Sequence, residues 1–298
     1  MPTKNILAID IGGTKIASGI VSFRKGGFDV SNYQKIKTPR NKKETIKKLL
    51  EITASYKNGG GFDGVGIATL GRVNRERGVV INAGNLKGWQ NVNLKKIIGR
   101  TTKKEVRVDN DVKCFALAES EFGKSKKYKN AVYLAIGTGL GGAIKIDGKL
   151  YRGEKNIAGE FGHMVIVNGG EKCACGNRGC WQQYVSGKAI EKLYYKFYSK
   201  RKNARDIALD SERGSSKDKK IIKKTASYLA AGFINIANTI NPEIIVVGGS
   251  VVKQKEILDF AVEEVKRKAL IPARKTKIAR SCLGERAILI GAAMLDAR

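Results

Sequence analysis

A strand, a tight glycine turn and a second strand follow one another at two distant places in this 298-residue chain. The apolar run at residues 5–10 leads through Gly12 and Gly13 into a second run at 15–23, and the run at 131–136 leads through GTGLGG into 143–146. Short runs that are rich in β-branched residues and bounded by glycines are typical of strands. Because internal similarity indicates a repeated unit, we predict an α/β protein with two related lobes.

Further elements can be placed around these two units. In the first lobe we expect a third strand at 28–38, a helix at 42–56 capped by Asn41, a buried strand at 65–68, a long loop to Trp89, a strand at 105–108 and a helix at 112–122. In the second lobe the charged stretch 199–220 is expected to be a loop or a short helix, and a further helix precedes the strand in NPEIIVVGGS. We place the N-terminal lobe at residues 1–115, completed by a C-terminal helix at 284–298, and the C-terminal lobe at 116–283.

The chain carries a formal net charge of +30 at pH 7. Such a charge can attract an anionic partner such as nucleic acid or polyphosphate, but the lysines are scattered and no nucleic-acid-binding module is recognisable. We therefore interpret the charge as a solvated, lysine-rich surface and expect no nucleic-acid partner. No apolar run approaches the roughly 18–20 residues of a membrane span, and no secretory signal precedes the first strand. A cytoplasmic protein without a membrane partner is expected.

Three glycine turns follow apolar strands and carry groups that can bind phosphate. Glycines let the backbone approach a ligand, and successive N–H groups form an anion-binding nest. Asp10, at the end of the first strand, could hold Mg²⁺ directly or through water. Each turn alone could equally be a simple hairpin, but three together favour a bound nucleotide, ATP. The predicted cofactor-binding residues are Asp10, Gly12, Gly13, Thr14, Lys15, Gly137, Thr138, Gly139, Gly248 and Gly249.

The segment Val108-Asp109-Asn110-Asp111 runs from a predicted strand into a predicted helix. Asn and Asp at such a boundary commonly cap the helix, which is one interpretation. The other is catalytic, because an ionised Asp111 within hydrogen-bond reach of a sugar hydroxyl could take its proton as the oxygen attacks a γ-phosphoryl group. The segment alone does not decide between a cap and a general base.

Three of the five cysteines fall within the short segment CACGNRGC, and the only histidine precedes it. One imidazole and three thiolates are the ligand set of a structural zinc site. The alternative is a group of buried thiols beside a core histidine, but the complete ligand set favours the metal. The other two cysteines, Cys114 and Cys282, lie in apolar surroundings and are expected to fill the core. The predicted metal ligands are His163, Cys173, Cys175 and Cys180.

Taken together, these motifs resemble those of the ROK family of sugar kinases and repressors. The resemblance covers nearly the whole chain and rests on AIDIGGTK, GVGIATLGRVN, GNLKGW, VDND, AIGTGLGGA, AGEFGH, CACGNRGC and NPEIIVVGGS. It implies an actin-like ATPase fold of two lobes, each with a ribonuclease-H-like core, and a cleft between the lobes. It also implies transfer of the ATP γ-phosphate to a hexose hydroxyl, by a glucokinase or hexokinase or alternatively by an N-acylmannosamine kinase or fructokinase. Homodimers or homotetramers are implied as well.

The resemblance further implies roles for single residues. Asp111 would be the catalytic base, and His163 would bind zinc through one ring nitrogen and a sugar hydroxyl through the other. Two departures from the family's pattern lie near the sugar: Leu70-Gly71-Arg72 replaces Pro-Gly-Pro, and Gln182 replaces a glutamate. The implied substrate-binding residues are Gly71, Asn85, Asn110, Asp111, Glu160, His163 and Gln182.

A sugar-responsive regulator or another nucleic-acid-binding protein is the alternative from a different class. In the repressors of the family a DNA-reading helix-turn-helix precedes the kinase-like part, and such a module needs at least two helices. The first phosphate turn of this chain already begins at Asp10. We therefore expect no such domain here and favour the kinase.

Overall fold

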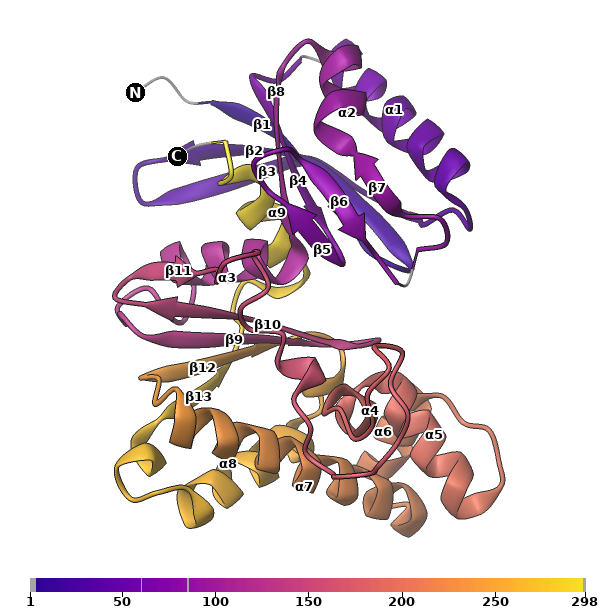
Figure 1. Ribbon diagram of the computed structural model, residues 1–298, viewed down its shortest axis with the longest axis vertical. Coiled ribbons are helices and arrows are strands. Elements are labelled where there is room, and N and C mark those ends of the chain that lie inside the picture. The colour runs from indigo at the N-terminus through magenta and orange to yellow at the C-terminus, as the bar shows by residue number, and fades with distance from the viewer. Residues whose placement is uncertain (1–3, 60, 85, 297–298) are drawn as a thin grey trace. The chain divides into compact units, whose positions relative to one another are not determined.

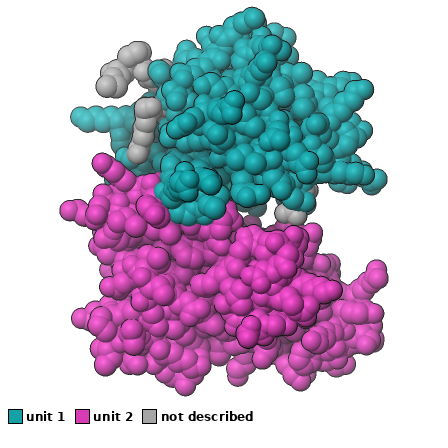
Figure 2. Space-filling model, in the orientation of Figure 1, with its two compact units in different colours: residues 1–126, 152–158, 283–298 teal, residues 127–151, 159–282 magenta. Residues whose placement is uncertain are grey.

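The computed structural model describes residues 4–59, 61–84 and 86–296, and the chain divides into two compact units (Figure 1). Unit 1 contains Met1–Lys126, Arg152–Ala158 and Leu283–Arg298, and unit 2 contains Lys127–Tyr151 and Gly159–Cys282 (Figure 2). Residues from three separate parts of the sequence therefore build unit 1, including the C-terminal segment.

Unit 1 is built on a five-stranded sheet in the order β3-β2-β1-β4-β8. Neighbours among β1, β2 and β3 are antiparallel, whereas β4 runs parallel to β1 and β8 parallel to β4. A second sheet has the antiparallel order β5-β6-β7. The elements of unit 1 are β1 (Asn5–Ile11), β2 (Lys15–Arg24), β3 (Gly27–Lys37), α1 (Lys42–Asn58), β4 (Gly64–Thr69), β5 (Arg72–Asn74), β6 (Val79–Asn82), β7 (Gln90–Asn93), α2 (Leu94–Thr102), β8 (Glu105–Asn110), α3 (Asp111–Glu121) and α9 (Ala287–Ala293).

Helices cover both faces of the five-stranded sheet of unit 1 (Figure 1). Leu7 and Ile9 of β1 pack in one cluster with α1 and α2, whereas Ile6 and Ala8 pack in another with α9. Helix α9 lies so close to β4 that a Cβ on Gly66 would collide with the helix backbone. Strands that are buried on both faces are continuously apolar and do not alternate between apolar and polar residues. These segments could therefore be recognised as strands from the sequence.

Unit 2 repeats this arrangement with the sheet order β11-β10-β9-β12-β13. Again the first three strands in the list are antiparallel neighbours, and the last two are parallel to β9 and to each other. The predicted duplication of a strand, glycine turn and strand is therefore confirmed. The elements of unit 2 are β9 (Ala131–Ile136), β10 (Leu140–Ile146), β11 (Lys149–Tyr151), α4 (Gln182–Val185), α5 (Gly187–Tyr198), α6 (Ala204–Glu212), α7 (Ser216–Thr239), β12 (Ile244–Gly248), α8 (Lys255–Lys268) and β13 (Lys277–Arg280).

The core of unit 2 lies between its sheet and the helices α7 and α8. Leu134 of β9 and Val247 of β12 belong to one buried cluster with Phe233 of α7 and Leu258 of α8. Trp181 is fully buried in the same cluster, where the ring takes the space that a side chain on Gly232 would need. Among the helices that the structure describes, none is both long enough and apolar enough to cross a membrane.

Two sequence expectations need correction, and a third, a loop or a short helix at 199–220, is confirmed. The expected long loop before Trp89 contains β5 and β6, and α2 follows β7 where Asn93 caps the helix by accepting from Lys96 N–H at 2.8 Å. These strands have only three or four residues each, which is too short for a periodic pattern to be visible. The stretch 199–220 contains all of α6 and the first turn of α7. Finally, Cys114 is buried as expected, but Cys282 is exposed because it lies in the turn after β13.

Candidate active site and metal centre

A turn of three residues joins β1 to β2 in unit 1. The Gly12 N–H donates to the Lys15 carbonyl at 2.9 Å, and the Thr38 hydroxyl donates to the Gly12 carbonyl at 2.7 Å. A Cβ on Gly12 would lie 2.9 Å from the same Lys15 oxygen, so the position has no room for a side chain. Gly13 and Thr14 are exposed. The turn is therefore closed by its own backbone and leaves Gly13 and Thr14 at the surface. Phosphate binding by it stays a prediction.

Two carboxylates lie beside this turn at the ends of strands. Asp10 of β1 pairs with Ala68 of β4, which pairs with Asp109 of β8, and Asp111 begins α3 directly after β8. Burial and, as a smaller effect, the Asp111 carboxylate raise the pKa of Asp10 to about 7. Carboxylate oxygens are ligands that Mg²⁺ prefers, and a cation would offset the repulsion between the two acids. The residues present therefore fit a magnesium ion at Asp10.

Asn110 connects the start of α3 to the loop that contains Gly71. Its side-chain oxygen accepts from the backbone N–H groups of Val112 at 3.0 Å and Lys113 at 3.2 Å, which confirms the helix-cap interpretation. Its side-chain amide donates to the Gly71 carbonyl at 3.1 Å. Gly71 has φ +89°, and a Cβ there would collide with the backbone of β6, so this turn requires glycine. The remaining predicted sugar-binding residue of unit 1, Asn85, lies outside the described residues.

Asp109 is a structural residue that the sequence analysis did not single out. It is fully buried, and its carboxylate accepts from Arg152 Nη1 at 2.7 Å and from Asn156 Nδ2 at 3.0 Å. The backbone N–H of Asn110 also donates to Asp109, at 2.8 Å. A buried carboxylate is stable only when it is paired and hydrogen-bonded. Asp109 therefore anchors the segment 152–158 to the strand that presents Asn110. No motif in the sequence links these positions.

The two glycine turns of unit 2 lie next to each other. The first closes with a hydrogen bond from Gly137 N–H to the Gly139 carbonyl at 2.9 Å. The second follows β12, the parallel neighbour of β9, and Gly249 with φ +98° leaves no room for a Cβ against the backbone of Ile136. A Cβ on Gly137 would lie 3.8 Å from Ser250 Oγ. The structure therefore brings these two predicted nucleotide turns together.

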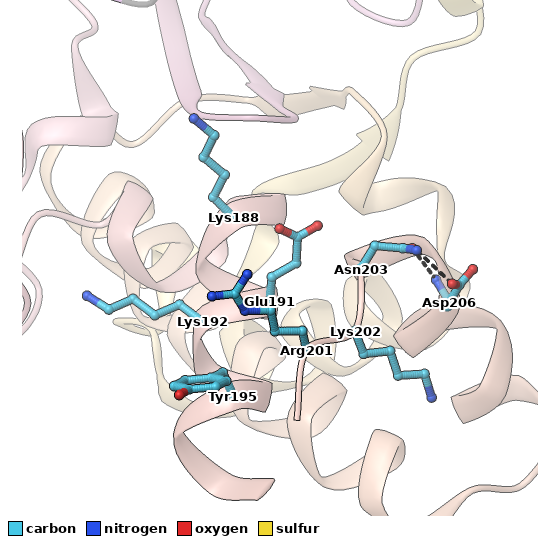
Figure 3. Close-up of a pocket in the computed structure, with 8 residues that line it drawn as sticks. All are labelled: Lys188, Glu191, Lys192, Tyr195, Arg201, Lys202, Asn203 and Asp206. Carbon is cyan, nitrogen blue, oxygen red and sulfur yellow. Dashed lines mark hydrogen bonds between the residues drawn. The ribbon is translucent and has the colours of Figure 1, made fainter. Parts of the chain in front are cut away.

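A pocket of about 660 Å³ lies between α5 and the start of α6. The N–H of Gly187, at the start of α5, donates to the Gly137 carbonyl at 2.8 Å, and Lys188 follows directly in the pocket wall. Figure 3 shows one row of lining side chains on α5 and the others on the segment that leads into α6 and on its first turn. The lining residues are Lys188, Glu191, Lys192, Tyr195, Arg201, Lys202, Asn203 and Asp206. The sequence analysis did not predict this pocket.

Glu160 and His163 lie on a segment that packs directly against β10. A Cβ on Gly162 would collide with the Leu140 carbonyl, and a Cβ on Gly142 would lie 2.6 Å from the Gly159 carbonyl. The three glycines therefore allow a close backbone approach that no other residue would permit. Glu160 and His163 are themselves exposed in this segment. Their contact with a sugar stays a prediction.

The four predicted metal ligands form one cluster in unit 2, and their ligand atoms all lie within 4.8 Å of one another. Cys173 Sγ is 3.7 Å from His163 Nδ1, and Cys175 Sγ is 3.6 Å from Cys180 Sγ. In a tetrahedral site with Zn–S bonds of about 2.3 Å, neighbouring sulfur atoms are about 3.7 Å apart. The donor set and its spacing therefore fit zinc. Because Nδ1 faces the cluster, Nε2 of His163 is left for a second partner.

The surroundings of the thiols are unequal. Burial opposes ionisation of Cys173, but the backbone N–H of Cys175 and the Gln182 side chain outweigh it and lower the pKa of Cys173 to about 6. Burial and the neighbouring thiols raise the pKa of Cys180 to about 12. Zinc binds thiolates, so metal binding here would release protons and depend on pH. The Gln182 amide, predicted to face a sugar, donates to Cys173 Sγ at 3.3 Å.

Comparison with known proteins shows the family. The chain matches the ROK family over residues 6–298. It is 31% identical over 302 residues to the N-acetyl-D-glucosamine kinase of Vibrio cholerae, covering 96% of this chain and 98% of that protein. It is 29% identical over 313 residues to the glucokinase of Streptomyces coelicolor, covering 97% and 96%. A ROK family glucokinase from Streptomyces griseus, solved with glucose and AMPPNP, has a TM-score of 0.87 at 28% identity, with 98% of both chains covered. The chain therefore belongs to the ROK family, and its fold is the predicted actin-like ATPase fold.

Proposed function

We propose that this ROK-family sugar kinase transfers the γ-phosphoryl group of ATP to a hydroxyl of glucose or a closely related hexose. The observation that carries the proposal is the setting of Asp111. Asp111 begins α3 directly after Asn110, whose side chain donates a hydrogen bond to the Gly71 carbonyl. The charge of Asp111 contributes to the raised pKa of Asp10. An acid that can take a proton thus lies near an acid that can hold a metal ion. Phosphoryl transfer to an alcohol uses both.

In this proposal each group of unit 1 has a separate task. An ionised Asp111 accepts the proton of the hexose hydroxyl while that oxygen attacks the γ-phosphorus and the bond to the ADP oxygen breaks. Asn110 orients the hydroxyl, because its own side chain is held by the α3 backbone and by Gly71. The turn Gly12–Thr14 binds phosphate oxygens through backbone N–H groups. Asp10 would hold Mg²⁺, which neutralises phosphate charge when bound.

Unit 2 is proposed to bind the donor. Its two adjacent turns would bind the phosphates. The pocket between α5 and α6, whose wall includes Lys188 directly after the Gly187 that bonds to Gly137, would hold the rest of the nucleotide. Within the pocket, Tyr195 supplies an aromatic ring, and Lys188 and Arg201 supply positive charge. A nucleoside phosphate can use all of these groups, whereas polyphosphate has no base or ribose. This composition supports ATP as the donor.

The proposed sugar contacts in unit 2 come from Glu160, His163 and Gln182. His163 would contact a hydroxyl through Nε2 while Nδ1 binds zinc. The name of the Vibrio cholerae relative adds N-acetyl-D-glucosamine as a second candidate substrate. Gln182 is consistent with either sugar, because an amide offers both a donor and an acceptor.

A substrate panel tests the proposal. Glucose, N-acetylglucosamine, N-acetylmannosamine and fructose would each be incubated with ATP or with polyphosphate, and the sugar phosphate quantified by chromatography. We expect the highest kcat/KM for glucose with ATP, and a kcat roughly 10²–10⁴-fold lower for Asp111→Asn. Absence of any phosphorylated sugar would refute the kinase assignment, and equal turnover with polyphosphate would refute ATP. Light scattering on the same preparation tests the expected homodimer or homotetramer.

A further inference from the structure

The side chain of Gln182 lies beside two parts of unit 2, the predicted metal-binding cysteines and the predicted phosphate-binding GTG turn. Its Nε2 donates to Cys173 Sγ at 3.3 Å. Its Oε1 lies by the GTG turn, where a Cβ on Gly139 would be 3.2 Å from that oxygen. One side chain therefore lies between the cysteine cluster and a predicted phosphate turn.

The backbone of Gln182 is held firmly by its neighbours. Cys180 and Trp181 are both fully buried. The Trp181 backbone N–H donates to the Met164 carbonyl at 2.8 Å, and its indole N–H donates to the Tyr228 carbonyl at 2.9 Å. Gln182 follows as the first residue of α4. A change of side chain at this position therefore changes the contacts at its end and not the course of the chain.

The chemistry of the two ends of the amide determines its orientation. A thiolate accepts hydrogen bonds, so the NH₂ group facing Cys173 is favourable, whereas the opposite orientation would place two acceptors together. Three thiolates and a neutral imidazole leave a net charge of about −1 around Zn²⁺. An N–H donor reduces that excess negative charge, but a glutamate in the same place would increase it and has no donor when ionised. The amide is therefore suited to this position in a way that a carboxylate is not.

We propose that Gln182 is a positioning residue of the metal centre, whose N–H···S hydrogen bond orients Cys173 for zinc and slows loss of the metal. The inference depends on zinc binding by the Cys₃His cluster and not on the identity of the sugar. Groups that hydrogen-bond to metal ligands typically change metal affinity by about 10–100-fold. Because Oε1 lies near Gly139, the same side chain also stands beside the GTG turn.

The test measures zinc affinity in the full-length chain. Wild type, Gln182→Glu, Gln182→Met and the control Gln183→Glu would be titrated with a chromophoric chelator. Gln183 is the next residue of α4 and is also half-buried. Gln183→Glu therefore introduces the same charge as Gln182→Glu at a neighbouring position of similar burial. We expect about 10–100-fold weaker binding for Gln182→Glu and about threefold to tenfold weaker binding for the uncharged Gln182→Met. Gln183→Glu should match wild type.

The absorption spectrum of the Co²⁺-substituted protein provides a second measurement that a general loss of stability would not change. Both Gln182 variants should remain tetrahedral but show shifted thiolate-to-cobalt bands. If Gln182→Met binds zinc and absorbs as wild type does, the hydrogen bond has no role and the proposal is wrong. It is also wrong if Gln183→Glu loses zinc as readily as Gln182→Glu. A wild-type protein that binds no zinc but phosphorylates sugar would refute this inference and leave the proposed kinase function intact.

Discussion

The two units have the same sheet order but different chemistry at the ends of their strands. The turn after β1 is preceded by Asp10, whereas Ala135 occupies the corresponding place before the turn after β9. The outermost parallel strand of unit 1 leads into Asn110 and Asp111, but that of unit 2 leads into Ser281 and Cys282. The same scaffold thus carries carboxylates in unit 1 and neutral turns in unit 2.

The comparison separates what the fold requires from what the chemistry requires. Gly71 and Gly249 follow the corresponding strands β4 and β12 and have φ of +89° and +98°, so both units need glycine there. The acids have no such counterpart. Burial raises the pKa of Asp10, which means that its ionised form is disfavoured in the fold. Ionised Asp10 is unfavourable for the fold, and unit 2 has no acid at the corresponding position. A function of Asp10 in unit 1 explains this difference best.

The largest effect is expected when Asp111, the proposed general base of unit 1, is neutralised. Asp111→Asn should lower kcat by roughly 10²–10⁴-fold, the usual share of a general base, while Tm and sugar binding change little. Asp147→Asn, which neutralises an exposed acid of unit 2, is the control and should behave as wild type. Steady-state kinetics and calorimetry on both variants decide the matter. If the kcat of Asp111→Asn stays within about threefold of wild type, Asp111 is not a general base, and the acids at the strand ends of unit 1 do not give it a separate catalytic role.

The second effect concerns the Cys₃His cluster of unit 2, which has no equivalent among the described residues of unit 1. Cys175→Ser should remove about one zinc per chain and cost about 4 kcal/mol or more, as loss of a structural metal does. At this chain length that is a fall in Tm of roughly 10 °C. Cys282→Ser is the matched control, because both cysteines are exposed and lie in unit 2. Elemental analysis and thermal scans give the answer. Zinc-free wild type, together with an unchanged Tm for Cys175→Ser, would rule out the site.

How much of this was visible in the sequence depends on the distance between interacting residues. The helix cap Asn41 was predictable because its partner, the Glu44 N–H, lies three residues away, and the bond is present at 2.9 Å. The cluster of one histidine and three cysteines was predictable because its members fall in a short segment. Asp109 was not, because Arg152 is 43 residues away and shares no motif with it.

The short elements were missed for a different reason. Strands β5, β6 and β7 contain three, four and four residues, so none spans enough alternations to show a period of two. The orientation of Gln182 was also beyond the sequence. The family resemblance implies a sugar contact for Gln182, which stays a prediction. The structure adds a hydrogen bond from its amide to Cys173, which depends on the packing around Trp181 and not on any sequence motif.

A third effect should appear in the dependence of activity on pH. Because the pKa of Asp10 is about 7, its neutral form predominates at lower pH and cannot hold Mg²⁺ as a carboxylate does. We expect kcat/KM for MgATP to fall about tenfold per unit below pH 7. Higher Mg²⁺ should move the midpoint down, because metal and proton compete. A midpoint that does not respond to Mg²⁺ would contradict metal binding by Asp10, and a flat profile from pH 6 to 8 would contradict its titration in this range.

The stability of the fold should respond to the titration of Asp10 in the opposite direction from activity, so that it falls as pH rises. The pKa of Asp10 is raised from 3.8 to about 7 in the fold, so between these values the folded protein keeps a proton that the unfolded chain releases. Stability from this group is therefore present at low pH and lost as pH rises through about 7. Asp10→Asn should raise Tm at pH 8 and have a smaller effect at pH 5.5. A lower Tm at pH 8 would show that the carboxylate stabilises the fold.

The smallest effect is expected at the glycines of unit 2, where stability and donor binding can be separated. A Cβ on Gly249 would meet the Ile136 backbone at a φ of +98°, so Gly249→Ala should cost about 1–3 kcal/mol. A Cβ on Gly137 would meet nothing closer than Ser250 Oγ at 3.8 Å, so Gly137→Ala should leave Tm unchanged. Its methyl group would nevertheless stand where we propose that phosphate approaches the backbone. The KM for ATP should therefore rise about tenfold, or roughly 1.4 kcal/mol, while the KM for sugar stays constant. An unchanged KM for ATP, with Tm also unchanged, would mean that this turn is only a hairpin and that unit 2 binds the donor elsewhere.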